Sequence, residues 1–460
     1  MDRRARGLAL LVAGAFFMEI LDATVIAPAA PHIAGDLGVP PVTVNVAITA
    51  YLLTLAVFIP ISGWLTERFG ARRVFTVAII VFTLASAGCA AAVNLPMLVG
   101  TRVLQGVGGA LMVPVGRLVV IRTTAKTDLV RAIAYLTWPA LAAPLIAPAL
   151  GGLLSTYASW RLIFLVNVPL GLLALPLARR LIPDVRADTP RRLDRRGFLL
   201  VATGTAALVA GLEGIADQNP RWPLAVALLF GAATALILTV VHLLRAANPL
   251  VDLRILRVRT YRVTALGGSV FRAVMNAIPF LLPLLFQLGF GWTAAQAGLV
   301  VIALFAGNIG IKPVTTPLMR RFGMRPVMAG AVLASAACLI ALSSLTGSTP
   351  LPLILLVLAL SGTFRSIGFT TYNTLAFADV PPERLTGANT LMSTVQELGA
   401  GLGVACGALL VRLGASFTEG AEPRFRVAFL ALAVLLVVPA VEAFRLPATA
   451  GNLIVGRAKS

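Results

Sequence analysis

The sequence predicts an all-α integral membrane protein built from two six-helix halves with two extra helices between them. The chain is 58% hydrophobic and only 12% charged over 460 residues, unlike a soluble domain. Apolar runs long enough to cross a bilayer recur along the whole chain. A short basic loop also occurs twice, which indicates two homologous halves, an architecture typical of secondary transporters.

Fourteen apolar segments are long enough to be transmembrane helices. In hydrocarbon every backbone polar group must find its partner within the segment, so each segment is expected to be helical. No alternating strand pattern indicates an additional soluble domain. The segments are 8–30, 43–63, 74–93, 96–118, 132–154, 162–181, 197–214, 222–244, 263–286, 294–316, 326–346, 351–376, 387–411 and 426–446.

The polar stretches between these segments divide the chain into six parts. The loop 182–196 is the most polar internal stretch, so the two segments after it are interpreted as an insert. The parts are an N-terminal six-helix half (1–181), a basic cytoplasmic loop (182–196), two inserted helices (197–244), a second basic cytoplasmic loop (245–262), a C-terminal six-helix half (263–446) and a cytoplasmic tail (447–460).

The net charge of +20 follows the expected membrane topology. If the N-terminus is cytoplasmic, 29 of the 38 Lys and Arg fall in cytoplasmic loops and tails. Membrane proteins carry such an excess on the cytoplasmic side, so both termini are expected there and the number of helices is even. The basic residues therefore indicate contact with anionic lipid headgroups rather than with nucleic acid.

The repeated loop has the pattern Arg-Phe-Gly-x-Arg-x-Val, at 68–74 and again at 321–327. Glu67 precedes the first copy, and its carboxylate can pair with cytoplasmic arginines or with a helix N-terminus. Such a contact would latch the two halves together on the inner side. The alternative is basic anchoring alone, which we expect for the second copy because it lacks an acid.

The sequence excludes ATP as a direct energy source. A Walker A loop needs a lysine after a glycine, and none of the three lysines follows one. The two histidines are far apart, and Cys89, Cys338 and Cys406 each lie alone in an apolar run, so no metal or other cofactor is expected. Without a catalytic cluster an enzyme is disfavoured, and an ion gradient remains as the energy source.

Five motifs together resemble one transporter family over nearly the whole chain. They are Leu21-Asp22-Ala23-Thr24-Val25-Ile26 with Pro31, the loop 63–73, Arg102-x-x-Gln105-Gly106-x-Gly108-Gly109, Ala147-Pro148-Ala149-Leu150-Gly151-Gly152, and 160–171, which begins Trp160-Arg161. With these motifs the chain resembles the major facilitator superfamily, in its fourteen-helix drug:proton antiporter branch of the EmrB/QacA type, and within it the MdtD-like multidrug exporters.

The resemblance implies the major facilitator fold, alternating access and proton coupling. It favours the latch for the first basic loop, with Gly63, Glu67, Arg68, Gly70, Arg72 and Arg73 as its residues. It also identifies an antiporter motif at Ala143, Ala147, Pro148, Gly151 and Gly152. The chain departs from the family pattern where alanines replace glycines at 143 and 147, where Glu67 replaces an Asp, and at Ala27-Pro28.

Asp22 and Arg102 are predicted to lie at the same depth in the membrane. Each is about 21 Å from the inner face, counted at about 1.5 Å per residue across a core of about 30 Å. Equal depth permits an ion pair, and a carboxylate that releases its arginine when protonated suits a proton-coupled switch. Glu19 lies three residues earlier, on the same helical face. The alternative is a structural ion pair that only positions helices.

Further charged residues are expected near the middle of the membrane. Glu397 is interpreted either as a second proton site or as a polar residue paired with a neighbouring helix. Arg272 and Arg365 could bind an anionic substrate or pair with Glu397, and Arg365 could instead extend to the inner interface. For Arg272 the pair with Glu397 is favoured. Tyr51 and Gln287 complete the predicted substrate cavity.

We therefore predict a proton-coupled exporter of small amphipathic compounds that works by alternating access. It is expected in the bacterial inner membrane, as a monomer, with protons and a small molecule as its ligands. The alternative within transport is export of an organic anion such as a carboxylate, bound by Arg272 and Arg365. A membrane-bound enzyme is the disfavoured alternative of another class.

Overall fold

The described part of the chain is entirely helical in its regular structure. The computed structural model describes residues 3–39, 41–125, 128–184, 186, 192–216, 222–414, 418, 420–447 and 449–451. Within these residues all regular elements are helices and none is a strand. The predicted all-α class is therefore confirmed.

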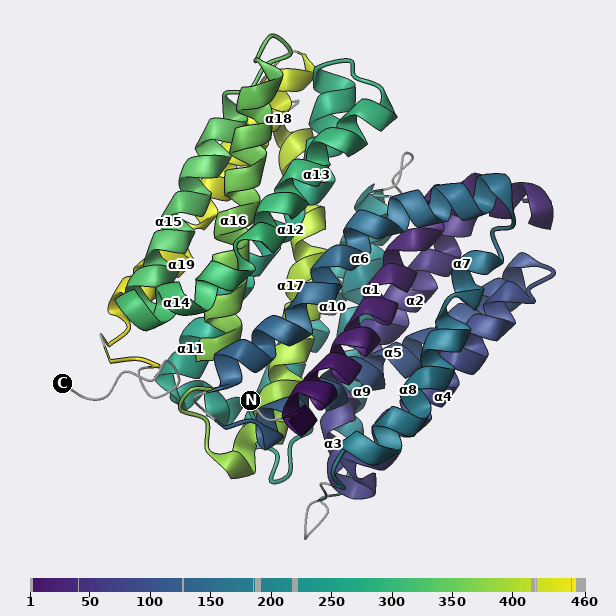
Figure 1. Ribbon diagram of the computed structural model, residues 1–460, viewed down its shortest axis with the longest axis vertical. Coiled ribbons are helices and arrows are strands. Elements are labelled where there is room, and N and C mark those ends of the chain that lie inside the picture. The colour runs from purple at the N-terminus through teal and green to yellow at the C-terminus, as the bar shows by residue number, and fades with distance from the viewer. Residues whose placement is uncertain are drawn as a thin grey trace.

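The helices form two bundles that lie beside each other (Figure 1). The first bundle, drawn in purple and blue, contains the short η1 (Pro41–Val44) and η2 (Ile59–Ile61), which flank α2. Its α-helices are α1 (Arg3–Leu37), α2 (Asn45–Phe58), α3 (Ser62–Phe69), α4 (Ala71–Ala90), α5 (Leu95–Thr123), α6 (Leu129–Tyr157), α7 (Leu162–Leu165) and α8 (Asn167–Leu181).

The second bundle is drawn in green and yellow, and several of its helices are interrupted by breaks (Figure 1). Its elements are η4 (Leu253–Arg257), α11 (Arg259–Ala265), α12 (Gly267–Leu284), the π-helical turn η5 (Leu285–Gly289), α13 (Ala294–Gly310), α14 (Lys312–Phe322), α15 (Met324–Ser343), α16 (Leu351–Leu375), η6 (Pro382–Arg384), α17 (Leu385–Gly414), α18 (Ala421–Leu435) and α19 (Val437–Arg445).

Two helices, α9 (Arg195–Ala216) and α10 (Trp222–Arg245), lie between the bundles in the sequence. They pack against each other, and α9 also packs against α2 of the first bundle and α17 of the second. The inserted pair thus contacts both bundles.

Asp194 ties the two ends of this inserted pair together. Its carboxylate lies 2.8 Å from Nε2 of His242 and accepts backbone hydrogen bonds from Gly197 at 2.8 Å and from Leu250 at 3.2 Å. Burial raises the pKa of Asp194, but these hydrogen bonds together outweigh burial and hold that pKa below its ordinary value. The acid of the polar loop therefore fixes where α9 begins and where α10 ends.

Each of the fourteen predicted segments falls on a helix. In the described part, eleven helices are long and apolar enough to cross a membrane, or up to twelve if α13 and α14, which meet at 47°, form one span. The segments predicted at 132–154 and 197–214 fall on α6 and α9, which are outside those eleven. The multi-pass fold is confirmed, while the number fourteen stays a prediction.

Several predicted helix ends are wrong by a turn or more. α1 continues through Pro28 and Pro31 to Leu37, and α5 continues to Thr123 instead of ending at 118. Helix ends are poorly encoded in sequence because local patterns blur where a helix leaves the membrane. The longer α5 matters, because it places Arg122 inside a helix rather than in a loop.

The repeated basic loop is a one-residue break rather than an open loop. α3 ends directly before Gly70 and α4 begins directly after it, and Gly323 separates α14 from α15 in the same way. The two glycines have φ values of 87° and 89°. Residues with a Cβ rarely adopt this conformation, so the glycine of the repeat sets the reversal of the chain.

The arginine two residues after each of these glycines makes the same kind of hydrogen bond in both copies. Arg72 donates from Nε to the carbonyl of Ile182 at 2.7 Å, directly after α8. Arg325 donates from Nη2 to the carbonyl of Phe444 at 2.8 Å, in α19. In each bundle the arginine therefore caps the end of the last helix, which satisfies a carbonyl that the helix leaves unpaired.

The two bundles touch each other near one end, which also carries Arg3 and Arg445; we call it the basic end. There Arg122 Nη2 donates to Thr386 Oγ1 at 2.6 Å, and Asn389 Nδ2 donates to the carbonyl of Pro114 at 2.8 Å. Figure 1 shows the bundles spreading apart toward the opposite end, which we call the far end. The molecule is thus closed at the basic end.

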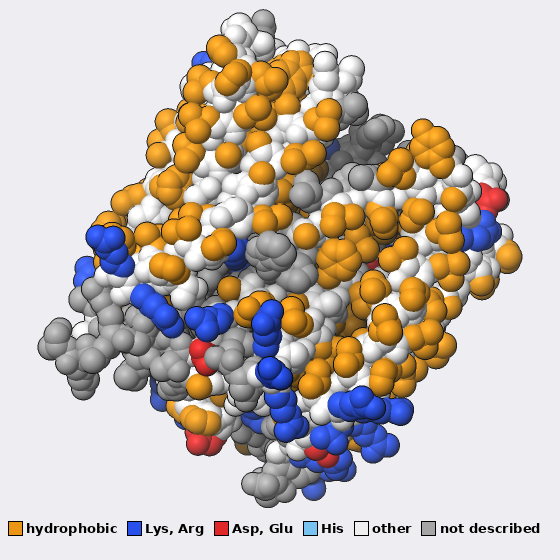
Figure 2. Space-filling view, viewed as in Figure 1, with side chains coloured by type: hydrophobic (Ala, Val, Ile, Leu, Met, Phe, Trp, Pro, Cys, Tyr) orange, Lys and Arg blue, Asp and Glu red, His pale blue; other side chains and the backbone are white. Residues whose placement is uncertain are grey.

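The surface agrees with a bilayer around the middle of the molecule. Figure 2 shows hydrophobic side chains over the sides of both bundles and a cluster of Lys and Arg at the basic end. Large apolar side chains are strongly exposed on the outside, such as Leu84 at 67%, Phe230 at 76% and Val434 at 68%. An apolar exterior of this extent fits lipid rather than water.

We predict that the glycine break is required for stability. A Cβ on Gly70 would lie 2.4 Å from Asp184 Oδ1 in a backbone conformation that costs other residues about 1–3 kcal/mol, so Gly70→Ala should lower the thermal unfolding midpoint of the protein in detergent. The control is Gly330→Ala in α15, where a Cβ meets nothing within 4 Å. Equal midpoints for both variants would show that the break tolerates a side chain.

Candidate functional site

The first bundle buries an ion pair at its centre. Nη1 of Arg102 on α5 donates to Oδ2 of Asp22 on α1, and both side chains are fully buried. Nε2 of Gln105 and Nδ2 of Asn167 each donate to Oδ1 of the same carboxylate at 2.8 Å. Asp22 is therefore held by three side chains from two other helices, which is what a buried carboxylate requires.

Arg102 has further partners on α2. Its Nε donates to the carbonyl of Ala47 at 3.3 Å, and its guanidinium lies 4.0 Å from the centre of the Tyr51 ring. Its Nη1 also donates to Oε1 of Gln105 at 2.8 Å. The cation is thus stabilised by a carbonyl, an amide and an aromatic face as well as by its carboxylate.

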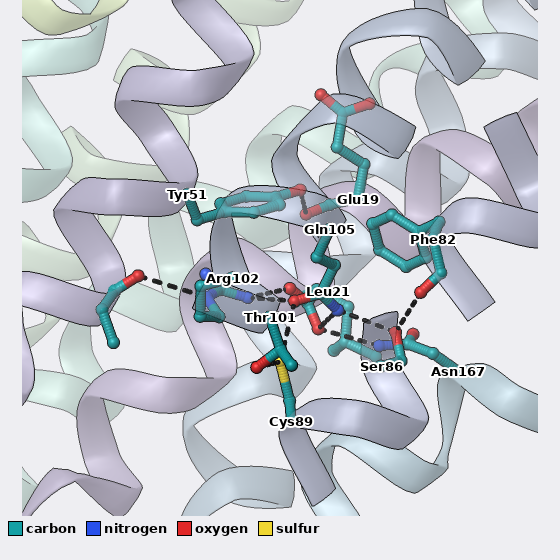
Figure 3. A network of polar contacts seen from close by, with 12 residues as sticks. Glu19, Leu21, Tyr51, Phe82, Ser86, Cys89, Thr101, Arg102, Gln105 and Asn167 are labelled. Carbon is teal, nitrogen blue, oxygen red and sulfur yellow. Dashed lines mark hydrogen bonds and ion pairs between the residues drawn. The ribbon is translucent and has the colours of Figure 1, made fainter. Parts of the chain in front are cut away.

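The network continues away from Asp22 through Gln105. Nε2 of Gln105 donates to Ser86 Oγ at 2.8 Å, and Sγ of Cys89 lies 3.6 Å from Oε1 of Gln105. Figure 3 shows Arg102 and Gln105, both on α5, and Asn167 of α8 converging on one region. The polar cluster therefore joins α1, α2, α4, α5 and α8, so its rearrangement would be felt across the whole first bundle.

Glu19 does not belong to this cluster, although the sequence places it on the same face as Asp22. Figure 3 shows its carboxylate pointing away from the cluster, while its backbone carbonyl accepts from the Tyr51 hydroxyl at 3.3 Å. Three residues turn an α-helix by about 300°, so the two side chains differ by about 60° in direction. That difference is enough to turn Glu19 toward the space between the bundles.

This space contains two adjoining chambers, of about 290 and 230 Å³. Both chambers are lined by Phe16, Ile20, Arg117, Arg272 and Gln396. The larger one is also lined by Lys312 and Arg365, and we call it the cationic chamber. The smaller one is also lined by Glu19 and Glu397, and we call it the acidic chamber.

The cationic chamber brings residues from both bundles together. Arg117 on α5 donates to Gln396 Oε1 at 2.8 Å and to Asn373 Oδ1 at 3.4 Å, so it crosses from the first bundle to the second. Arg272 on α12 donates to the same oxygen of Asn373 at 3.1 Å. Arg365 on α16 donates to Asn276 Oδ1 at 3.1 Å.

The favoured ion pair between Arg272 and Glu397 is not formed in this structure. Both side chains line the acidic chamber, but Arg272 bonds to Asn373 and lies 4.7 Å from the centre of the Phe369 ring. Among the described residues, no side-chain nitrogen of a Lys, Arg or His lies within 4.0 Å of a carboxylate oxygen of Glu397, so Glu397 forms no ion pair there. The amide and the ring, both on α16, hold the guanidinium instead.

Two residues assigned to the cavity from the sequence lie elsewhere. Tyr51 is fully buried beneath Arg102 and belongs to the ion-pair cluster. Gln287 lies in the π-helical turn η5 near the far end, where it donates to the carbonyl of Pro283 at 3.2 Å. Neither lines the two chambers, because helix direction, which composition does not reveal, decides which face meets the cavity.

Two cavity residues, Arg117 and Lys312, were not identified as site residues from the sequence. Arg117 lies on α5, inside the segment predicted at 96–118, and is only 7% exposed. Lys312 begins α14, is 6% exposed, and donates to Thr370 Oγ1 at 2.8 Å. The signal was present for Lys312, since a charged residue inside a transmembrane segment usually has a function.

Glu67 lies at the basic end, in a small pocket of about 50 Å³ between the bundles. Thr386 and Gly387, in the first turn of α17, line the same pocket. Gly63 also lines it, and a Cβ there would come within 2.3 Å of Thr390 Oγ1. The predicted latch residues Gly63 and Glu67 are therefore placed at the contact between the bundles.

Two other residues of the predicted latch, Arg68 and Arg73, are exposed and do not line that pocket. Their position is where positive charge meets lipid headgroups, so anchoring explains them without a latch.

The antiporter motif forms the contact between α6 and α1. Ala143 and Ala147 are fully buried, and a Cβ on Gly151 would lie 2.5 Å from the carbonyl of Val25. Gly152 has nothing within 4 Å, and the side chain of Pro148 lies outside the described part of the chain. Small residues thus allow the two helix backbones to approach closely.

Comparison with known proteins identifies the family. The sequence profile of the Major Facilitator Superfamily matches residues 12–248 and 264–453. MdtD of Salmonella dublin, provisionally named a multidrug resistance protein, is 36% identical over 456 residues, covering 98% of this chain and 97% of the relative. MdtD of Salmonella typhimurium strain LT2 has the same identity and coverage.

Solved structures share the fold at low sequence identity. The human organic anion transporter MFSD10 superposes with a TM-score of 0.69 at 13% identity, covering 96% of this chain and 100% of that one. The proton:xylose symporter XylE, bound to a halogenated glucose, gives a TM-score of 0.66 at 14% identity and 97% coverage of both chains. The profile, the relatives and the fold agree, and the chain belongs to the Major Facilitator Superfamily.

Proposed function

We propose that this protein is a proton-coupled exporter of small amphipathic compounds that works by alternating access. The observation that carries the proposal is the pair of chambers between two bundles that touch at the basic end. A site at the interface of two halves becomes accessible from each side of the membrane in turn when the halves rock. The relatives named for multidrug resistance support an exporter of drug-like compounds.

The proposed topology places the basic end in the cytoplasm of a bacterial cell, with both termini there. The excess of Lys and Arg at that end supports this orientation under the positive-inside rule. With the bundles closed at the basic end, the structure then corresponds to an outward-facing state. The two chambers would open to the outer side, where an exporter releases its substrate.

The Asp22–Arg102 pair is the proposed proton-coupling element. Protonation of Asp22 would remove the charge that holds Arg102, and the freed cation would disturb a cluster spanning five helices. Glu19 and Glu397 line the acidic chamber and are proposed as further proton-binding groups on its wall. Protons are thus expected as the coupling ion, without another cofactor.

The pocket around Glu67 is the proposed inner latch. Glu67 shares the pocket with residues of the N-terminal turn of α17, where the helix dipole favours negative charge. In the inward-facing state this contact between the bundles would have to break. Glu67 would therefore stabilise the outward-facing state relative to the inward-facing one.

We predict that Asp22→Asn abolishes proton exchange. The amide keeps the shape of the side chain and can still accept from Arg102, but it has no titratable charge, so the protein should remain folded and membrane-inserted. The test is the collapse of a pH gradient in inside-out vesicles on addition of an amphipathic substrate. The control is Asp36→Asn, which removes a carboxylate bonded to Arg161 and Trp160, far from the chambers.

Wild-type proton movement in Asp22→Asn would show that Asp22 has no part in coupling. Failure of the wild-type protein to move protons with amphipathic cations, neutral compounds and carboxylates alike would reject the proposed exporter itself.

We predict that Glu67→Lys shifts the protein away from the outward-facing state. The dipole of α17 attracts an anion at its first turn and repels a cation there, and each of these interactions is worth about 0.3–1 kcal/mol. A single cysteine at Ile20, in the chambers, should react more slowly with a membrane-impermeant thiol reagent added from the outer side. Glu67→Gln should give an intermediate rate, and an unchanged rate in both variants would contradict the latch.

A further inference from the structure

We propose that the substrate of this exporter is an amphipathic organic anion, held in the cationic chamber by Arg365, Arg272, Lys312 and Arg117. The inference rests on the proposed transport function and specifies its substrate class. The observation behind it is that one chamber collects four cations, three of them buried and Arg272 half-buried, and that none of them forms an ion pair with an acid in the described part of the chain.

The four cations bond to neutral groups. The acceptors are side-chain amide oxygens for the three arginines and a threonine hydroxyl for Lys312. Arg365 is the least satisfied, since it is 8% exposed and its Nε and Nη1 are buried without a hydrogen-bond partner. A buried cation whose donors are only partly satisfied is costly unless an anion compensates it.

The arrangement of the arginines indicates where the anionic group would bind. Arg117 and Arg272 both donate to the single oxygen Oδ1 of Asn373, at 3.4 and 3.1 Å. Arg272 and Arg365 both lie over the ring of Phe369, at 4.7 and 5.3 Å from its centre. Three like charges therefore surround one small region, and their mutual repulsion is relieved most by an anion placed among them.

The rest of the chamber fits the apolar part of such a compound. Its wall includes the side chains of Phe16, Ile20, Ile133, Leu136 and Phe305. A cavity of about 290 Å³ with apolar walls and a few charged groups suits a small organic molecule better than an inorganic ion. We therefore expect an aromatic or aliphatic body that carries a carboxylate, sulfonate or phosphate group.

The carboxylates of the neighbouring chamber offset these charges only in part: Glu397 attracts Arg272, which lines both chambers, but forms no ion pair with it. Glu19 and Glu397 line the acidic chamber and not the cationic one. Arg365 and Lys312 line only the cationic chamber, so no carboxylate shares their wall.

The test compares two probes with the same ring and opposite charge, naphthalene-2-sulfonate and naphthalen-2-yltrimethylammonium. Their binding to the full chain is measured by equilibrium dialysis in a neutral detergent without anionic lipid. We expect the sulfonate to bind at least about tenfold more tightly than the ammonium compound, as expected when charge-assisted bonds worth about 1.5–3 kcal/mol are gained.

Arg365→Gln should weaken binding of the sulfonate by about tenfold or more. The matched control is Arg196→Gln, which removes one positive charge from an exposed position at the start of α9 and should leave the affinity unchanged. Arg365→Lys keeps the charge but loses the planar fork, so it should retain the preference for the sulfonate with reduced affinity.

Thermal unfolding of the same variants separates recognition from structure. Without its anionic ligand, the protein carries a buried cation that lowers its stability. Arg365→Gln removes that cation, so this variant should unfold at the same or a higher temperature than wild type. Equal or tighter binding of the ammonium probe, or an unchanged sulfonate affinity in Arg365→Gln, would overturn the proposal. These binding results stand apart from the proton assay, which tests the exporter itself and can fail independently.

Discussion

The cost of placing charge inside a membrane protein is the constraint on which this structure depends. A buried carboxylate or guanidinium is tolerated only when partners replace its hydration. Asp22 and Arg102 meet that requirement together, with Gln105 and Asn167 completing the coordination of the carboxylate. Because the cluster around this pair joins five helices of the first bundle, the packing of those five helices depends on the charge state of the pair.

The charged residues of the second bundle have partners of a different kind. Arg272, Arg365 and Lys312 have amide, hydroxyl and aromatic partners but no acid within ion-pair distance among the described residues. The first bundle thus contains a neutralised pair, while the cavity between the bundles retains an excess of positive charge. In our proposal the pair responds to protons and the excess charge binds substrate, which separates the two tasks in space.

The two halves share the turn that holds each bundle together, but they do not share the charged residues of the cavity. Gly70 and Gly323 reverse the chain in the same conformation, and Arg72 and Arg325 cap the last helix of their own bundle. The charged cavity residues do not repeat in this way. The repeated turn holds each bundle together as a unit, which is what movement of one bundle against the other requires, while the site between them uses residues particular to each half.

The sequence by itself determined the helical class, the segments, the duplicated turn and the common depth of Asp22 and Arg102, because these follow from hydropathy, periodicity and counted rise along a helix. It did not determine that Glu19 turns to the cavity while Asp22 turns away, or that Arg272 bonds to Asn373 rather than Glu397. Nor did it place Arg117 in the cavity, since the sequence does not reveal which face of α5 meets the second bundle. The rotation and crossing of packed helices decide those contacts, and rotation arises from the whole set of neighbours rather than from any local pattern.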